Sequence, residues 1–409
     1  MRRALLIGLV AIACRSRSDE HASPTPTATP SVPSTPIVAS TPIDPPAAAG
    51  ALAPQLRADA DGVLATWLEP AGDGAHRLVW AQWTRGAWTK PQQISAGTAI
   101  VASAADVPSI ARSNDGALVA HWAEKREGDR DGYSAVVARS TDGATWTRLG
   151  ALHDDHTPTE HGFVSLIAEG DASIRAFWLD GRMTASGGAT ALRSAAVGKT
   201  IGASAVVDDR VCDCCSTAIT HTLGGALIAY RDRSADEIRD VAIAQASGQG
   251  WRRTIVARDN WKIEGCPVNG PAVTYDGYRL AVAWYTMADN VPRVRVAFSN
   301  NGGLTFGAPI DVASGQGDGA PLGRVGVVVD GSTVIISWLA ARSGGASVLV
   351  RRVAANGQQG RAITAGETAD RDAGFPRIAQ DGNAVIVMWT DPGAPKRLRA
   401  ITLPAGKIP

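Results

Sequence analysis

Short apolar segments that end in an aromatic residue recur along the chain at a nearly constant spacing. They read VLATW, LVAHW, IRAFW, ALIAY, LAVAW, VIISW and VIVMW, and their final aromatics are Trp67, Trp122, Trp178, Tyr230, Trp284, Trp338 and Trp389. Successive aromatics are 55, 56, 52, 54, 54 and 51 residues apart. Self-similarity at a fixed period of this length is the signature of a repeat architecture. The chain therefore contains seven copies of one structural unit.

Each unit carries further short apolar runs, one before the aromatic segment and two after it. Examples are FPRIAQ before an aromatic segment and YSAVVARS and TWTRLGAL after one. These runs alternate or are β-branched, and Gly, Asp, Asn and Ser bound them, as is typical of strands joined by turns. No stretch keeps a helical apolar period through three turns, so helices should be few. Repeated units of four antiparallel strands predict an all-β fold, a seven-bladed β-propeller.

The last unit shows only three clear strands, ending in RLRAITLPAG. We therefore expect a strand near the N-terminus, such as PIVAS (Pro36–Ser40), to complete this blade and close the ring. An aromatic residue at one repeat position is more often core between blades than a platform for a ligand. The seven repeated aromatics are accordingly expected to be buried.

A charged and apolar segment precedes the repeats. Two arginines lead into the apolar run Ala4–Ala13, which is too short to span a bilayer. The run closes in AIAC (Ala11–Cys14), which resembles the lipobox of bacterial lipoproteins. That resemblance implies a signal peptide over residues 1–14 and a lipid on Cys14, and Arg15 after the cysteine implies sorting to the outer membrane. The alternative is an ordinary signal peptide with a chance cysteine.

Residues 15–50 are rich in Pro, Thr and Ser, a composition that buries no core and favours extended conformations. We expect a disordered tether that holds a propeller domain of residues 51–409 away from a membrane. The formal net charge is +1 and there is no basic run, which argues against nucleic acid as a partner. The sequence thus predicts a monomeric lipoprotein of the bacterial cell envelope, facing the periplasm or the cell surface.

Two turns resemble a known motif. STDGATW (Ser140–Trp146) and SNNGGLTF (Ser299–Phe306) are similar to the Asp-box, Ser-x-Asp-x-Gly-x-Thr-Trp, of sialidase-like (BNR-repeat) propellers. The first copy is one residue short, and the second has Asn301 and Phe306 for the Asp and the Trp. In that family the motif is a structural turn far from the ligand face. The resemblance spans most of the chain and implies a propeller, usually of six blades, which is the alternative to the seven counted here.

The same resemblance raises sialidase chemistry as a hypothesis. Sialidases hold a substrate carboxylate with three arginines and use a Tyr nucleophile with a Glu partner and an Asp acid/base. Their opening Phe/Tyr-Arg-Ile-Pro motif is absent, and the closest strings are PQLRAD (Pro54–Asp59) and FPRIAQ (Phe375–Gln380). The family can therefore describe the scaffold without its chemistry.

Propeller geometry predicts which segments meet at the mouth of the central channel. The first strand of each blade starts at the ligand face and the second strand returns to it, so these ends converge. Units three to five then bring together the strand starts His161–Phe163, Cys212–Cys215 and Cys266–Asn269 and the strand ends Asp180, Arg182, Arg231, Asp232 and Tyr285.

Four of the five cysteines lie in these segments. In an exported protein a disulfide from Cys212 or Cys214 to Cys266 would join units four and five, and the remaining two cysteines would form a second pair. The alternatives are a zinc or Cu(I) site built by Cys212, Cys214, Cys266 and His161, and a redox-active disulfide. If the segment is a strand, Cys212 and Cys214 point one way and Cys215 points the other.

The loop HDDHTPTEH (His153–His161) holds three of the seven histidines. We expect His153 and His156 to be solvated, whereas His161 can serve either the site or the scaffold.

Charged and amide side chains supply the remaining candidates. Arg182 and Arg231 can hold a carboxylate or sulfate, or can simply form ion pairs on the surface. The acid/base candidates are Asp180, Asp232 and Glu237, with Tyr285 at the same mouth. The residues that flank Cys266 offer a stacking ring and amides of the kind that carbohydrate sites use, namely Asn260, Trp261 and Asn269.

Three functions remain open from the sequence. The first is a module that binds a glycan or a cell-envelope protein. The second is an exo-sialidase-type glycoside hydrolase acting on acidic sugars. The third is a thiolate site for copper or zinc, or a redox site.

Overall fold

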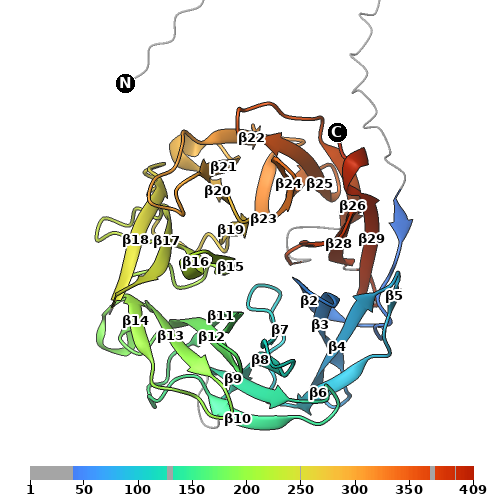
Figure 1. Cartoon of the computed structure of the whole chain (residues 1–409), viewed down its shortest axis with the longest axis vertical. Coiled ribbons are helices and arrows are strands. Elements are labelled where there is room, and N and C mark those ends of the chain that lie inside the picture. The colour runs from blue at the N-terminus through green and yellow to red at the C-terminus, as the bar shows by residue number, and fades with distance from the viewer. Residues whose placement is uncertain (1–39, 127–131, 249, 369–373, 392) are drawn as a thin grey trace, which may run out of the picture. The chain divides into compact units, whose positions relative to one another are not determined.

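The computed structural model describes residues 40–126, 132–248, 250–368, 374–391 and 393–409. These residues form seven antiparallel sheets set around a central channel (Figure 1). Each sheet is one blade, so the predicted all-β, seven-bladed propeller is confirmed and the six-bladed alternative is wrong. Within the described ranges the helical segments are three single turns of 3-10 helix, Thr184–Ser186, Ala288–Asn290 and Ala405–Lys407.

The blades share one strand order, from the channel outward. The first strands are β2 (Leu52–Asp59), β7 (Ser109–Arg112), β11 (His161–Glu169), β15 (Ala218–Thr222), β19 (Ala272–Tyr275), β23 (Pro321–Asp330) and β27 (Arg377–Asp381). The second are β3 (Gly62–Pro70), β8 (Leu118–Lys125), β12 (Ser173–Asp180), β16 (Gly225–Arg231), β20 (Leu280–Thr286), β24 (Thr333–Arg342) and β28 (Ala384–Asp391). The third are β4 (His76–Thr84), β9 (Tyr133–Ser140), β13 (Ala191–Val197), β17 (Val241–Ser247), β21 (Arg293–Ser299), β25 (Gly345–Ala354) and β29 (Arg397–Pro404). The outermost are β1 (Thr41–Pro42), β5 (Ala87–Trp88), β6 (Gln92–Gly97), β10 (Thr147–Ala151), β14 (Ala205–Asp208), β18 (Gly250–Ala257), β22 (Ile310–Ser314) and β26 (Ile363–Thr368).

The seven repeated aromatics all lie on second strands, and none is more than 8% exposed. Burying an indole requires a partner for its N–H, and several blades supply a carboxylate two residues later on the same face of the strand. Trp67 Nε1 donates to Glu69 at 2.8 Å, and Trp178 Nε1 donates to Asp180 at 2.9 Å. The repeated aromatics are therefore core between blades, as predicted.

The N-terminal end of the described chain closes the ring. Strand β1 pairs with β29, so the seventh blade takes its outermost strand from the other end of the chain. A closing N-terminal strand was predicted, but it lies at Thr41–Pro42, and Pro36–Ala39 of the PIVAS string are outside the described residues. Ile43 and Ala47, which precede the expected domain start at residue 51, pack against the core of the first and seventh blades.

The predicted leader, the lipobox cysteine Cys14 and most of the predicted tether also lie outside the described residues. In the described part of the chain, no helix has the length and apolar character needed to cross a membrane.

The two turns that resemble Asp-boxes join third to fourth strands, between β9 and β10 and between β21 and β22. In the first turn, Ser140 Oγ accepts the N–H of Gly143 and Asp142 Oδ1 accepts that of Thr145, at 2.8 and 2.7 Å. In the second turn, Asn301 Oδ1 replaces the aspartate oxygen and accepts the N–H of Thr305 at 3.0 Å. The turn thus needs an acceptor oxygen rather than a charge.

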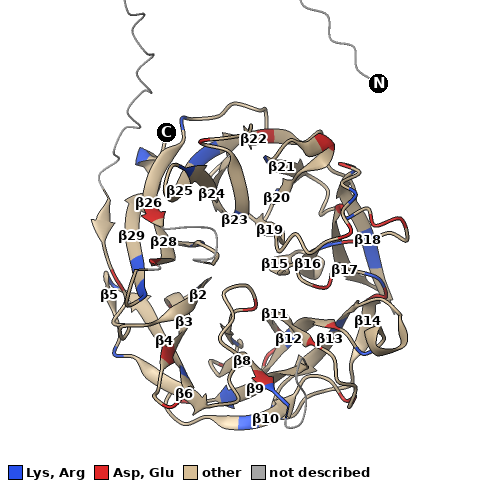
Figure 2. Ribbon diagram, turned by 180° about the vertical axis from the view of Figure 1, so that it is seen from behind, with Lys and Arg blue, Asp and Glu red and all other residues tan. Residues whose placement is uncertain are grey.

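All seven first strands line the central channel, which has a volume of about 520 Å³. Acidic and basic segments are interspersed around the ring (Figure 2), in keeping with the near-neutral net charge. The channel and the loops at its mouth are therefore the features that can give the molecule a distinct site.

Candidate functional site

A pocket of about 460 Å³ lies at the mouth of the channel, among loops that precede the first strands of blades two to five. Its lining includes Asp106 before β7, Glu160 and Phe163 around the start of β11, Cys214 before β15, and Tyr133 at the start of β9. Asp106 and Phe163 also line the channel, so the pocket adjoins it. Starts of first strands do converge, as propeller geometry predicted, but the pocket includes blade two as well as blades three to five.

Asp106 is the titratable group with the most distinctive surroundings in this pocket. It is 5% exposed, and its Oδ1 accepts the N–H of Phe163 at 2.8 Å. Burial raises the pKa of Asp106 to about 7, although the Phe163 N–H and the neighbouring Tyr133 hydroxyl favour its charged form. Its Oδ2 is buried and accepts no well-aligned hydrogen bond from the described residues. Asp106 can therefore gain or lose a proton near neutral pH, and its Oδ2 lies between Gly162 and Tyr133.

Positive charge lines the channel that adjoins this pocket. Burial lowers the pKa of Arg57 to about 10 and that of Arg377 to about 9, so both remain protonated at neutral pH. Arg377 Nε donates to the carbonyl of Pro54 at 3.1 Å. The guanidinium groups of Arg324 and Arg377 lie 4.0 and 5.1 Å from the ring centroid of Phe375. Because such charges act in a partly desolvated space, they favour a negatively charged ligand.

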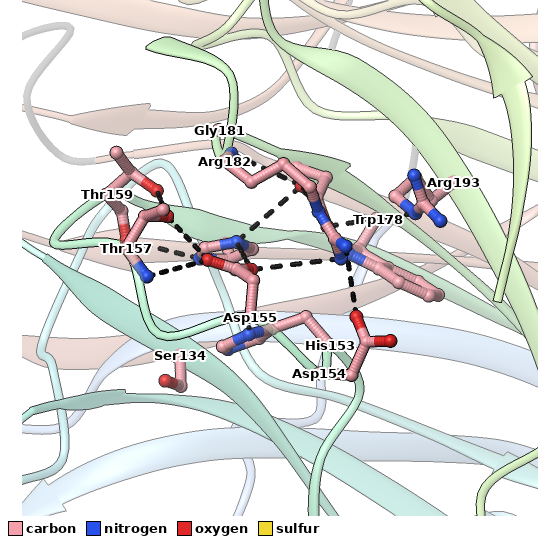
Figure 3. A network of polar contacts seen from close by, with 12 residues as sticks. Ser134, His153, Asp154, Asp155, Thr157, Thr159, Trp178, Gly181, Arg182 and Arg193 are labelled. Atoms are coloured by element: carbon pink, nitrogen blue, oxygen red, sulfur yellow. Dashed lines mark hydrogen bonds and ion pairs between the residues drawn. The ribbon is translucent and has the colours of Figure 1, made fainter. Parts of the chain in front are cut away.

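A separate polar network contains His153, Asp155 and Arg182 (Figure 3), and it also includes His161. His161 Nε2 is 2.6 Å from Asp155 Oδ2, and the Nδ1 of His153 is 3.2 Å from the same oxygen. The two imidazole rings stack with centroids 3.8 Å apart. Both histidines are buried, which corrects the prediction that His153 is solvated, whereas His156 is exposed as expected.

The ligand atoms of His153, Asp155 and His161 lie within 4.8 Å of one another, a set of two histidines and one carboxylate that can hold a divalent metal. The nitrogens of both rings already have close partners, however. Arg126 lies 3.1 Å from His161 Nδ1 and 3.2 Å from His153 Nε2, and the opposite ring nitrogens face Asp155. His161 Nδ1 also lies 3.1 Å from the Thr159 carbonyl, whereas His161 Nε2 and Asp155 Oδ2 are buried and make no well-aligned hydrogen bond with the described residues. The three side chains therefore meet closely without a metal and keep the arrangement that a divalent metal would need.

Asp180 has a structural role at the edge of this network. It is fully buried and accepts the indole N–H of Trp178 and the Nε–H of Arg182, the latter at 2.7 Å. Arg182 also pairs with Asp154 at 3.0 Å. These contacts correct the predictions that Asp180 is an acid/base catalyst and that Arg182 holds a substrate carboxylate.

Arg231 is buried to 2% exposure and donates to three backbone carbonyls. These are the carbonyls of Arg239, Asn269 and Tyr285, at 2.6, 2.9 and 2.7 Å. Its guanidinium also lies 5.0 Å from the ring centroid of Trp261. Arg231 therefore joins the loops of blades four and five instead of gripping a ligand, which corrects the prediction.

The other predicted binding residues also serve the scaffold. Trp261 and Tyr285 are buried and meet edge to face with centroids 5.7 Å apart, so Trp261 is no stacking platform. Asn269 Oδ1 accepts the N–H of Arg324 at 2.8 Å, which links blades five and six. Asp232 pairs with Arg253 at 3.2 Å. Asn260 is exposed and is not among the residues that line the pocket.

The structure joins Cys214 to Cys266, which links the loops that precede the first strands of blades four and five. Cys212 and Cys215 are buried and are not joined by a disulfide in the structure, and their sulfurs are 2.8 Å apart. The segment is a turn, because β15 begins only at Ala218, so Cys212 and Cys215 face each other instead of pointing apart. The predicted metal set of Cys212, Cys214, Cys266 and His161 is not assembled, since His161 lies against Asp155.

Sequence reasoning missed the residues that line the mouth pocket, chiefly Asp106, Tyr133 and Glu160. Applying the rule of converging strand starts to units two and seven would have found Asp106, just before β7, and Arg377, the first residue of β27. Tyr133 begins a third strand, and no motif in the sequence marks it.

Comparison with known proteins supports the fold. No protein-family model matches the chain, and no curated protein sequence does either. Among solved structures, a protein of unknown function from Dyadobacter fermentans is similar, with a TM-score of 0.50 and 17% identity over 91% of this chain and 100% of that one. An alpha-L-arabinofuranosidase of Fusarium graminearum in complex with arabinobiose has a TM-score of 0.51 and 14% identity, covering 90% of this chain and 98% of its own. An ulvan lyase, bound to a saccharide that contains GlcA, has a TM-score of 0.56 and 10% identity over 89% and 96%.

Proposed function

We propose that this propeller binds an acidic saccharide at the mouth of its channel. The observation that carries the proposal is the buried carboxyl of Asp106, held by the Phe163 N–H and beside Tyr133, in a pocket that adjoins a channel containing Arg377. The arginine favours a carboxylate or sulfate, and the protonated Asp106 can donate to a sugar oxygen. Two propellers of similar fold, the arabinofuranosidase and the ulvan lyase, act on saccharides.

Binding can be measured by calorimetry with oligouronates, sulfated oligosaccharides and neutral oligosaccharides of equal length. The Arg377→Gln variant should bind the acidic ligands about 10-fold more weakly or worse, because a hydrogen bond to a charged group contributes about 1.5–3 kcal/mol. Arg397→Gln is the matched control, since Arg397 is the exposed first residue of β29 and lines neither the pocket nor the channel. Equal affinity for acidic and neutral saccharides, or no effect of Arg377→Gln, would contradict the proposal.

A second candidate function is cleavage of that saccharide, as in the hydrolase hypothesis drawn from the sequence. The specific observation is the pKa of Asp106, about 7, which suits a general acid or base at neutral pH. Wild-type protein would be incubated with the ligands it binds, and new reducing ends and unsaturated uronates would be measured. Asp106→Asn and Tyr133→Phe should reduce turnover at least about 100-fold, within the range that acid–base catalysis contributes. Asp73→Asn, at an exposed turn, is the control. Tight binding without turnover would contradict the cleavage hypothesis, and the protein would then be a binding module only.

We also propose that the chain is a monomeric outer-membrane lipoprotein that presents this mouth to envelope glycans or to an envelope protein. The AIAC string at Ala11–Cys14 supports it. Labelling with a fatty-acid analogue and membrane fractionation test it, and Cys14→Ala should abolish both the label and the membrane association.

A further inference from the structure

Four cysteine sulfurs form a graded series from the surface to the interior at the mouth of the channel. Cys266 is exposed, and its disulfide partner Cys214 is half-buried and lines the mouth pocket. Behind them, the sulfur of Cys212 lies 3.8 Å from that of Cys214 and 2.8 Å from that of Cys215. Cys212 and Cys215 are each only 1% exposed. A buried dithiol thus stands directly behind a disulfide that solvent and other proteins can reach.

The surroundings of the two buried thiols differ in a way that assigns them different roles. Burial acts against a charged Cys212, yet the hydrogen bond from Cys215 and the positive charges of Arg231 and Arg239 lower its pKa to about 6. Arg239 lies 3.3 Å from the Cys212 sulfur. Burial raises the pKa of Cys215 instead. The thiolate is the reactive form of cysteine. Cys212 is therefore the nucleophile, and Cys215 stays a protonated thiol.

We propose that the four cysteines form a thiol–disulfide relay that passes two electrons between the buried pair Cys212–Cys215 and the accessible pair Cys214–Cys266. In the first step the Cys212 thiolate attacks Cys214 Sγ. The Cys212–Cys214 bond forms, the Cys214–Cys266 bond breaks, and Cys266 leaves as a thiolate.

In the second step Cys215 gives its proton to the Cys266 thiolate and attacks Cys212 Sγ. The Cys212–Cys215 bond forms, the Cys212–Cys214 bond breaks, and Cys214 leaves as a thiolate. One disulfide and one thiolate exist before and after the two steps, so the exchange is neither a net oxidation nor a net reduction. The accessible dithiol that results can then reduce an external disulfide at the mouth, which regenerates the Cys214–Cys266 bond and leaves the protein oxidised by two electrons.

The relay makes a prediction that a purely structural disulfide does not. Full-length chain carrying Cys14→Ser and Cys266→Ser is reduced, freed of reductant and exposed to glutathione disulfide. The accessible Cys214 thiolate attacks this disulfide, forms a mixed disulfide and releases one glutathione. Cys212 should displace the glutathione and Cys215 should then displace Cys214. The expected product is a Cys212–Cys215 disulfide without bound glutathione, identified by intact mass and peptide mapping after acid quenching.

Two further variants in the same background define the steps. With Cys212→Ser added, one glutathione should remain on Cys214. With Cys215→Ser added, the product should stop at a Cys212–Cys214 disulfide. If the Cys266→Ser protein retains glutathione on Cys214 to the same extent as the variant that also lacks Cys212, the relay is wrong. Thermal unfolding of each variant verifies that it is folded.

A measurement on the chain with Cys14→Ser alone avoids any loss of folding caused by the other substitutions. Protein holding only the Cys214–Cys266 disulfide is incubated in graded glutathione buffers, quenched with acid, alkylated and mapped. The relay predicts that a measurable share of the one-disulfide molecules carry the Cys212–Cys215 bond. Finding Cys212 and Cys215 alkylated in every one-disulfide molecule, or locked by a stoichiometric bound metal, overturns the proposal.

Discussion

Gly162 lies directly against the carboxyl group of Asp106. A Cβ atom on residue 162 would come within 2.0 Å of Asp106 Oδ2 and within 2.7 Å of the Tyr133 ring. The neighbouring residue Phe163 donates its N–H to the same carboxyl group. The backbone of blade three therefore approaches so closely that only glycine fits, and this approach sets the position of Asp106 and Tyr133 at the mouth.

Replacing Gly162 with alanine should displace Asp106 and Tyr133. The three atoms nearest to the new methyl group belong to the side chains of Asp106 and Tyr133 and not to the backbone, so the fold should persist. Overpacking should nevertheless destabilise the protein by about 1–3 kcal/mol. Urea unfolding measures the loss, and calorimetry should show weaker saccharide binding. Gly198→Ala is the matched control, because the nearest atom to its Cβ lies at 3.8 Å. Unchanged binding in Gly162→Ala would show that the position of Asp106 does not matter to the ligand.

Asp180 should contribute far more to the free energy of unfolding than Asp154, which belongs to the same network but is exposed. Asp180→Ala leaves the buried indole N–H of Trp178 and part of the Arg182 guanidinium without a partner, and breaking such a buried pair costs about 3–5 kcal/mol. Asp154 pairs with Arg182 too, but its side chain is 82% exposed, so Asp154→Ala should cost less than about 1 kcal/mol. Chemical denaturation of the two variants checks the ranking, and similar losses for both would contradict it.

Arg231 should contribute to the stability of the fold and not to ligand contact. Arg231→Met keeps much of the apolar bulk over Trp261 but leaves the buried carbonyls of Asn269 and Tyr285 without their donor. We expect a loss of about 3 kcal/mol, since each unsatisfied buried group costs about 1–3 kcal/mol. Arg233→Met, which removes partly exposed ion pairs with Glu237 and Asp213, should cost less than about 1 kcal/mol. A folded Arg231→Met protein of wild-type stability would contradict this role.

The ionisation of Asp106 should make the protein less stable as the pH rises. Its pKa is raised from 3.8 to about 7 in the folded state, so between these values the folded protein binds more protons than the unfolded chain. Stability contributed by protonated Asp106 is present below about pH 4 and is lost as the pH rises through about 7, with an upper limit of about 4 kcal/mol. Asp106→Asn should remove this dependence, so the unfolding free energy of wild type minus that of the variant should fall by up to about 4 kcal/mol from pH 4 to pH 8. Parallel stability profiles of the two proteins would show that Asp106 does not titrate in this range.

The blade architecture could be predicted from the sequence because it depends on local pattern. An aromatic residue that recurs about every 50 residues, within runs that alternate and end in turn residues, reports the second strand of a unit that can only be buried against its neighbours. The buried Trp67, Trp178 and Trp338 follow from that rule alone. The same reasoning predicted which ends of the blades face the channel mouth, and it placed the cysteines there.

The identity of the site residues could not be predicted from the sequence. It depends on which side chains of neighbouring blades form the core, which form internal hydrogen bonds and which line the pocket. Arg231 and Asp180 lie at the predicted ends of their strands. Arg231, however, donates to buried backbone carbonyls, and Asp180 accepts the indole N–H of Trp178. Asp106 and Tyr133 meet only because blade three presents a glycine where they approach it. Sequence alone determined the repeated unit and its number, since strand and turn patterns are local. Only the tertiary structure decided which polar groups remain for a ligand, since each buried donor or acceptor must first be satisfied by whichever partner the packing brings near.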